Sequence, residues 1–320
     1  MTTGSPTISV VVPVFRSAGS LDELVTRTVA ALEPIAQAFE ILLVNDGSPD
    51  DSWQRICTLA NTEPRVRGLC LNRNYGQHNA LLAGIRHARF DLIVTMDDDL
   101  QHRPEQILTL IESMSDDVDL VYGYPENERH SIARNFLSRA TKLTLGASIG
   151  SEVAEHISAF RVFRSVLRDG FTGVQDPFLS LDVLLAWTTN HIVAIPVPMD
   201  ERRNGDSTYT SGALIRYALN LITGFSTLPL RLVTYVGFGF AFFGMLTLTY
   251  VLVTYIIHGG VSSPGFPFLA SLISILSGAQ LFAIGIIGEY IGRMHYRTMN
   301  RPPYIVRRVT PSACQQVPPQ

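Results

Sequence analysis

The sequence predicts an α/β protein in which a doubly wound, mostly parallel sheet is followed by an amphipathic helix and two membrane-spanning helices. Short apolar runs alternate with helical segments in the first third of the chain, which is typical of a doubly wound sheet. Two long runs without a charged residue lie in the last third of the chain. Each run exceeds the roughly 20 residues that a helix needs to cross a bilayer.

Four apolar runs predict the first strands, and helix or turn signals separate them. The run at 8–14 precedes a stretch from Ser20 to Glu23 that has the spacing of a capping box, which opens a helix. Since Gly-x-Gly-x-x-Gly does not follow the first strand, the phosphate loop of a dinucleotide-binding fold is missing. The strands are expected at 8–14, 40–44, 66–71, 92–96, 156–163 and 192–197, and the helices at about 21–38, 51–59, 76–88 and 132–145.

Three adjacent aspartates follow the strand expected at 92–96. Side chains alternate along an extended chain, so Asp97, Asp99 and Gln101 should point one way and Asp98 the other. Open α/β sheets bind ligands at the carboxyl ends of their strands, and hard oxygen donors suit Mg²⁺ or Mn²⁺. We therefore expect a metal site at Asp97, Asp99 and Gln101, and we expect Asp98 to tolerate replacement. The alternative is a solvated acidic turn, in which three acids would repel each other without a cation.

The other strand ends carry polar residues that should meet the aspartates at one edge of the sheet. A nucleotide lying across this edge would place its base near the first two strands and its diphosphate at the metal. As alternatives, Asp46 could hold its own turn and Arg73 could be a surface charge. The expected nucleotide-binding residues are Pro13, Val14, Phe15, Asn45, Asp46, Arg73, Asn74 and Asp97.

The uncharged runs, at about 232–257 and 266–288, predict a pair of membrane spans, with two buried core helices as the alternative. The loop between them contains no Lys or Arg, whereas arginines flank both outer ends, so the positive-inside rule places both termini in the cytoplasm. The net charge of −3 argues against a nucleic-acid binder. The expected divisions are a cytoplasmic domain at 1–209, an amphipathic helix at 210–230, the spans within 231–292 and a cytoplasmic tail at 293–320.

Several stretches resemble the motifs of one enzyme family. Residues 44–48, 72–77 and 96–102 resemble those of inverting family-2 glycosyltransferases with the GT-A fold. The resemblance covers about residues 7–308, and its C-terminal motifs, 287–293 and 301–306, are similar to those of polyprenyl-phosphate glycosyltransferases. That group includes dolichyl-phosphate mannose synthase and the bacterial bactoprenol glucosyltransferases.

The resemblance implies roles for individual residues. Asp97 would contact the nucleotide, while Asp99 and Gln101 would hold the metal; Asn45 stands where the family has an acid that contacts the base. In the loop after the last expected strand, Thr208 replaces the family's lysine. The residues matched to binding of the acceptor phosphate are Arg134, Ser138, Arg139, Arg203 and Ser207.

These features predict inverting transfer of one sugar from a nucleotide-sugar, with a UDP-sugar favoured, to a polyprenyl phosphate at the cytoplasmic face of the membrane. A lipid phosphate is already anionic at pH 7 and needs no general base, so the metal site together with Arg134 and Arg203 would carry catalysis. Asp176 and Asp182 lie where other family-2 enzymes have a catalytic acid. The alternatives are a GDP-mannose donor, a hydroxyl acceptor, a polysaccharide synthase and an inactive membrane scaffold. Gly288 and Gly292 could support a homo-oligomer.

Overall fold

The fold is described from a computed structural model, which describes residues 5–126, 156–175, 180–200, 228–257, 265–299 and 301–310. The chain forms two compact units. The first contains Met1–Ala218 together with Asn300–Gln320, and the second contains Leu219–Met299.

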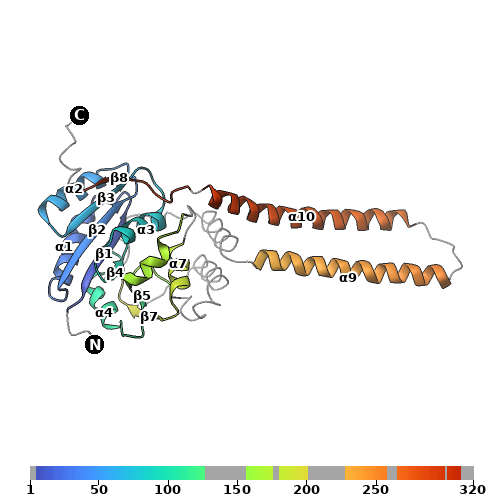
Figure 1. Cartoon of the computed structure of the whole chain (residues 1–320), viewed down its shortest axis with the longest axis horizontal. Coiled ribbons are helices and arrows are strands. Elements are labelled where there is room, and N and C mark those ends of the chain that lie inside the picture. Colours follow the sequence, from blue (N-terminus) through green and yellow to red (C-terminus); the bar gives the residue numbers. More distant parts are fainter. Residues whose placement is uncertain are drawn as a thin grey trace. The chain divides into compact units, whose positions relative to one another are not determined.

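The first unit is built on an eight-stranded mixed sheet with the order β7-β5-β6-β4-β1-β2-β3-β8 (Figure 1). The strands β4, β1, β2 and β3 are parallel neighbours, so their carboxyl ends share one edge. Strand β6 is antiparallel to both of its neighbours, and β8 is antiparallel to β3. The strands are β1 (Thr7–Val14), β2 (Ala38–Asn45), β3 (Val66–Leu71), β4 (Leu92–Thr95), β5 (Leu120–Pro125), β6 (Arg161–Arg164), β7 (Ile192–Val197) and β8 (Val306–Val309).

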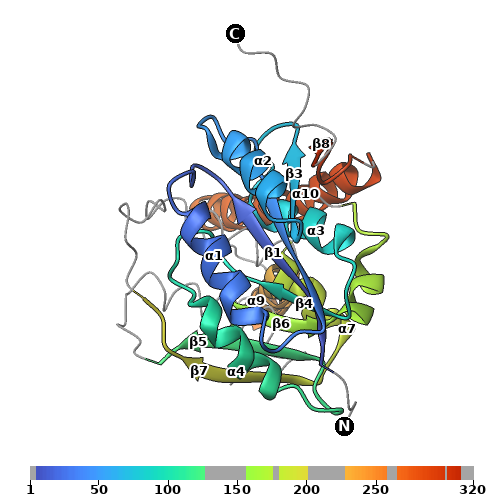
Figure 2. The same ribbon diagram turned by 90° about the vertical axis from the view of Figure 1, so that its left-hand side faces the viewer.

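Helices cover both faces of this sheet because the central strands are apolar on both sides. The first face carries α1 (Leu21–Leu32), α2 (Ser52–Thr62), η1 (Pro104–Gln106) and α4 (Ile107–Glu112), and the second carries α3 (Gln77–His87), η2 (Ser165–Phe171) and α7 (Leu181–Thr188) (Figure 2). Along β1, Val10 and Val12 belong to the core under α1 and α2, whereas Val11 belongs to the core under α3.

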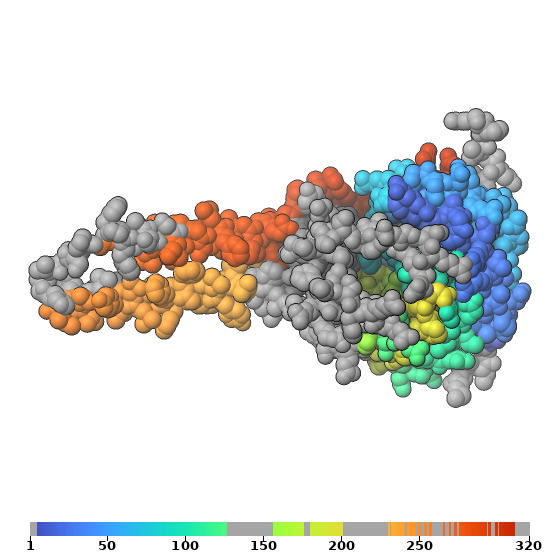
Figure 3. Space-filling view, turned by 180° about the vertical axis from the view of Figure 1, so that it is seen from behind, coloured from blue at the N-terminus to red at the C-terminus, as the bar shows by residue number. Residues whose placement is uncertain are grey.

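The second unit contains two long helices, α9 (Leu228–Ile257) and α10 (Phe266–Thr298), which lie side by side (Figure 3). Within α10, the segment Ile275–Gly292 is long and apolar enough to cross a membrane. The apolar segment of α9, Leu232–Thr247, is shorter than that criterion requires. One of the two predicted spans therefore has support in the described part of the chain, and the second stays a prediction.

Several expectations differ from the structure in extent. Strand β6 begins at Arg161 rather than at 156, and β5 was not expected. Residues 301–310, assigned above to a tail, belong to the first unit, where they include β8. The expected helix at 132–145 and most of the amphipathic helix at 210–230 lie outside the described residues.

Candidate active site

A cavity of about 330 Å³ opens where β1, β2 and β4 end and the loop before α3 begins. Six of the eight expected nucleotide-binding residues line it: Pro13, Val14, Phe15, Asp46, Asn74 and Asp97. The lining is completed by Gly76, Gln77, Asp98 and Asp99. The structure thus brings most of the predicted strand-end residues around one cavity, with three carboxylates on the turn after β4.

The carboxylates of Asp97 and Asp98 have partners on opposite faces of the sheet. Gln77 Nε2, at the start of α3, donates to Asp97 Oδ1 over 2.6 Å. The Phe15 backbone N–H, in the loop before α1, donates to Asp98 Oδ2 over 3.1 Å. The main chain of Asp97 is held as well, because its N–H donates to Nδ1 of the buried His102 over 3.1 Å. Both Gln77 and His102 were missed by the sequence analysis, since neither follows a predicted strand directly.

Asp98 has a structural role that the alternation argument did not anticipate. Burial raises the pKa of its carboxyl to about 6, although the Ser17 side chain nearby and the hydrogen bond from the Phe15 N–H act in the opposite direction. The Ser20 hydroxyl also donates to the Asp98 carbonyl over 2.7 Å. Asp98 therefore joins the acidic turn to the loop between β1 and α1, and the expectation that it tolerates replacement is revised.

The backbone around the aspartates adopts an uncommon conformation. Leu100 has φ of 63° and Arg16 has φ of 59°, and these are the non-glycine residues with positive φ in the described part of the chain. Leu100 is buried and follows Asp99, while Arg16 follows the cavity residue Phe15. Since such conformations persist only where the surroundings impose them, both turns at the cavity are held by their contacts.

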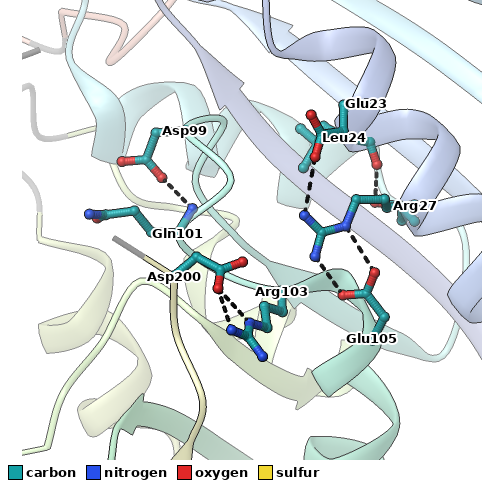
Figure 4. A network of polar contacts seen from close by, with 9 residues as sticks. Glu23, Leu24, Arg27, Asp99, Gln101, Arg103, Glu105 and Asp200 are labelled. Atoms are coloured by element: carbon teal, nitrogen blue, oxygen red, sulfur yellow. Dashed lines mark hydrogen bonds and ion pairs between the residues drawn. The ribbon is translucent and has the colours of Figure 1, made fainter. Parts of the chain in front are cut away.

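A hydrogen-bond network fixes the far end of the acidic turn (Figure 4). The Gln101 N–H donates to Asp99 Oδ1 over 3.1 Å, and the Asp200 N–H donates to the Gln101 carbonyl over 2.9 Å. Arg103 pairs with the Asp200 carboxylate, and its Nε donates over 2.8 Å. The chain after β7 is thereby fastened to the turn that carries Asp99 and Gln101.

The donor set fits a divalent cation that is bound together with a diphosphate. In the described ranges, no group of three or more His, Cys, Asp or Glu side chains forms a complete metal site. Asp97 and Asp99 nevertheless line the same cavity. Mg²⁺ is commonly held by one or two carboxylates, with substrate phosphates and water completing its shell. Asp97 and Asp99 therefore provide the two carboxylates that such a site needs from the protein, and Gln101 lies next to Asp99.

Asp46 holds the loop before α3 and not merely its own turn. It is 3% exposed, and its two carboxylate oxygens accept from the N–H groups of Tyr75 and Gly76 over 2.7 and 2.8 Å. Burial raises the pKa of this carboxyl, and the two N–H groups lower it. Gly47 lets the chain pass this loop closely: its φ is 63°, and a Cβ there would lie 2.5 Å from the Arg73 carbonyl carbon.

Asn45 and Arg73 are not among the residues that line the cavity in the part of the chain described. Asn45 is 2% exposed; its Nδ2 donates to Cys70 Sγ over 3.4 Å, and its Oδ1 accepts from the Ser48 N–H over 3.3 Å. Arg73 is exposed, and its guanidinium lies 4.7 Å from the centre of the Tyr75 ring. Their contact with a nucleotide stays a prediction.

Asp182, a candidate for the catalytic acid position, is engaged in an ion pair. Its Oδ1 accepts from the guanidinium of Arg161, which is 1% exposed, and from the Tyr122 hydroxyl over 3.3 Å. Arg161 Nε also donates to Thr95 Oγ1 over 2.9 Å. Arg161 therefore has a structural role in this ion pair. The other expected catalytic or acceptor residues lie outside the described residues: Arg134, Ser138, Arg139, Asp176, Arg203 and Ser207.

Comparison with known proteins agrees with this geometry. The model of glycosyl transferase family 2 matches residues 9–170, and the model of the GtrB C-terminal hairpin matches residues 228–294. The undecaprenyl-phosphate 4-deoxy-4-formamido-L-arabinose transferase of Pseudomonas paraeruginosa is 35% identical over 97% of this chain and 92% of its own. The protein of the same name from Shewanella sediminis is 35% identical over 94% of this chain and 92% of its own.

Solved structures support the fold. A mycobacterial protein superposes with a TM-score of 0.52 at 19% identity, over 68% of this chain and 74% of its own. Mannosyl-3-phosphoglycerate synthase from Rubrobacter xylanophilus superposes with a TM-score of 0.50 at 14% identity, over 68% of this chain and 74% of its own. With a matched catalytic domain and relatives aligned over nearly the whole chain, this protein belongs to glycosyl transferase family 2 and is a glycosyltransferase.

Proposed function

We propose that this glycosyltransferase moves one sugar from a nucleotide-sugar to a polyprenyl phosphate at the cytoplasmic face of a membrane, with inversion at the anomeric carbon. The observation that carries the proposal is the similarity to undecaprenyl-phosphate sugar transferases, which extends over the catalytic domain and the helical hairpin together.

The cavity is proposed to hold the donor, with its diphosphate at Asp97 and Asp99. A divalent cation bound there, Mg²⁺ or Mn²⁺, would neutralise the charge that develops on the departing nucleoside diphosphate. Surrounding residues keep Asp97 in place: Gln77 donates a hydrogen bond to its carboxylate, and His102 accepts one from its main-chain N–H. Such fixed geometry is useful because the donor then meets preorganised oxygens.

The acceptor is proposed to be held by Arg134, Ser138, Arg139, Arg203 and Ser207, as the resemblance implies. Its phosphate is already an anion near pH 7 and needs positioning rather than deprotonation. A hydroxyl acceptor is the second candidate. It would need a general base such as Asp182, whose carboxylate is paired with Arg161 in this structure.

The hairpin is proposed to span the membrane twice, with both termini and the catalytic domain in the cytoplasm. The apolar segment Ile275–Gly292 and the match to a hairpin model support this arrangement. A cysteine placed at Ser262 or Ser263 should react with an impermeant reagent added outside the cell, whereas Cys57 should not. Protection of the introduced cysteine would overturn the topology.

The relatives' names offer a candidate for the sugar, 4-deoxy-4-formamido-L-arabinose. The donor is proposed to be a UDP-sugar, with GDP-mannose as the alternative. A homo-oligomer is also proposed. Gly288 and Gly292 on α10 would permit close helix packing, since a Cβ at either position meets nothing within 4 Å among the described residues.

The central test supplies membranes containing the full-length protein with labelled UDP-sugars or GDP-mannose, undecaprenyl phosphate and Mg²⁺ or Mn²⁺. A labelled lipid should form with one donor. Asp99→Ala should abolish its formation, and Glu112→Ala, which removes an exposed acid at the end of α4, should not. If no donor yields a labelled lipid, the proposed reaction is wrong; an active Asp99→Ala variant would remove the metal assignment.

A further inference from the structure

Residues 301–310, here called the C-terminal strap, form the edge of the sheet beside β3 (Figures 1 and 2). The Asn72 N–H donates to the Ile305 carbonyl over 2.9 Å, at the carboxyl end of β3. Further along, the Gly68 N–H donates to Thr310 Oγ1 over 2.7 Å, and the Thr310 N–H donates to the Gly68 carbonyl over 3.0 Å. Thr310 is 4% exposed, so the strap is attached to β3 at both ends.

The strap is attached where the loop before α3 begins. Asn72 opens the loop 72–76, in which Asn74 and Gly76 line the cavity. On its inner side this loop is held by Asp46, through the N–H groups of Tyr75 and Gly76. At its beginning it is held by the strap. The loop that borders the cavity is therefore fixed by the β2 turn and by a segment more than two hundred residues later in the chain.

Tyr304 connects the strap to α3. Its ring packs against the core on the α3 side of the sheet, and the Arg86 guanidinium lies 5.7 Å from the ring centre. Arg86, near the end of α3, also donates to the carbonyls of Phe171 and Val174 over 2.6 and 2.8 Å. The first residue of the same helix, Gln77, holds the Asp97 carboxylate. Tyr304 thus braces the helix that positions an aspartate of the donor site.

We infer that the C-terminal strap positions the donor site, with Tyr304 as a positioning residue for nucleotide binding. The inference rests on the proposed function only in taking the cavity as the site of a nucleoside diphosphate. A loop and a helix that are ordered before the nucleotide arrives lose less conformational entropy on binding, and the affinity rises accordingly. A strap that merely covered an exposed sheet edge would protect against aggregation and leave nucleotide affinity unchanged.

The test measures the Kd of full-length, detergent-purified protein for UDP and for GDP with Mn²⁺, by calorimetry. Tyr304→Ala should raise the Kd of whichever diphosphate the wild type binds by about 2- to 30-fold, the usual range for residues that act through others. Tyr304→Phe should restore the wild-type Kd, because it keeps the ring beside Arg86. The matched control is Val166→Ala, which trims an apolar side chain that is 62% exposed in the same unit and should change nothing.

A wild-type Kd in Tyr304→Ala overturns the inference. If that variant does not fold, Thr310→Val decides, because it removes the hydroxyl that accepts from the Gly68 N–H and keeps the side-chain size. An unchanged Kd in folded Thr310→Val overturns the inference, and a raised Kd that Thr310→Ser restores supports it. The two proposals can fail independently. If the wild-type protein binds UDP but forms no labelled lipid, the proposed transfer to a polyprenyl phosphate is refuted, whereas the inference about the C-terminal strap is still tested by the Kd values.

Discussion

Asp98 offers the sharpest test of the site, because its position between Asp97 and Asp99 made it the aspartate expected to be dispensable. Its carboxylate accepts from the Phe15 N–H over 3.1 Å. Asp98→Ala leaves this N–H without its protein acceptor, and the net contribution of one hydrogen bond to stability is about 0.5–1.5 kcal/mol. Part of this loss is offset, since burial already disfavours the charged carboxylate and raises its pKa to about 6.

We therefore expect Asp98→Ala to lower the free energy of unfolding by about 0.5–1 kcal/mol, the lower part of the range for the loss of one hydrogen bond. It should also raise the KM for the donor, because Phe15 borders the cavity. Asp98→Asn keeps an amide oxygen at the same place and carries no buried charge, so it should remain near the wild type in both properties. The assays are urea unfolding in detergent and steady-state transfer at varied donor concentration.

Asp99→Ala is the matched comparison for this experiment. It should lose transfer activity even where the protein stays folded, since Asp99 is assigned to the metal and the donor, and it should lower the free energy of unfolding only by the loss of the hydrogen bond from the Gln101 N–H. If Asp98→Ala unfolds at the wild-type urea concentration with an unchanged donor KM, Asp98 does not have the structural role assigned to it. The same conclusion follows if the Ala and Asn variants behave alike.

Three further predictions follow from single contacts. Gly47→Ala should lower the free energy of unfolding by about 1–3 kcal/mol, because it places a Cβ at a residue with positive φ and against the Arg73 backbone. The control in urea unfolding is Gly173→Ala, where a Cβ meets open space and the free energy of unfolding should hardly change. Asp182→Ala should lower the free energy of unfolding by about 3–5 kcal/mol, because it leaves the buried Arg161 guanidinium without its acceptor and counter-charge; a melting temperature equal to that of the wild type would contradict this role of the ion pair. EDTA should abolish the thermal stabilisation of the wild type by the bound nucleoside diphosphate and added Mn²⁺ should restore it; stabilisation that persists in EDTA would exclude the metal from nucleotide binding.

The parts of the fold that could be predicted are those with strong local signals. The central strands β1, β2, β3 and β4 are apolar and buried on both faces, and each is followed by a helix or a turn sequence. Strand β5 was missed because its short run includes Gly123 and Pro125, which are depleted in strands. Strand β8 was missed because it contains two adjacent arginines and pairs with β3, whose Gly68 lies 242 residues from Thr310.

The same distinction applies to the cavity. The rule that ligands bind at the carboxyl ends of parallel strands predicted the residues that directly follow β1, β2 and β4. It could not predict that Asn45 would be buried against Cys70, since that depends on the neighbouring strand. Gln77 and His102 act on Asp97 from 20 and 5 residues away, and the sequence gives no local sign of either contact.

The ion pair at Asp182 bears on which acceptor the site can activate. A general base must take up a proton from the substrate, and the residue therefore needs an oxygen that can approach the hydroxyl group. In this structure Asp182 Oδ1 already accepts from Arg161 and Tyr122. Protonation of Asp182 would neutralise the counter-ion of a guanidinium that is 1% exposed, and a buried charge without a partner is strongly destabilising. If Asp182 served as the base for a sugar hydroxyl, it would have to give up this ion pair, whereas a lipid phosphate, which arrives as an anion, would leave the ion pair intact.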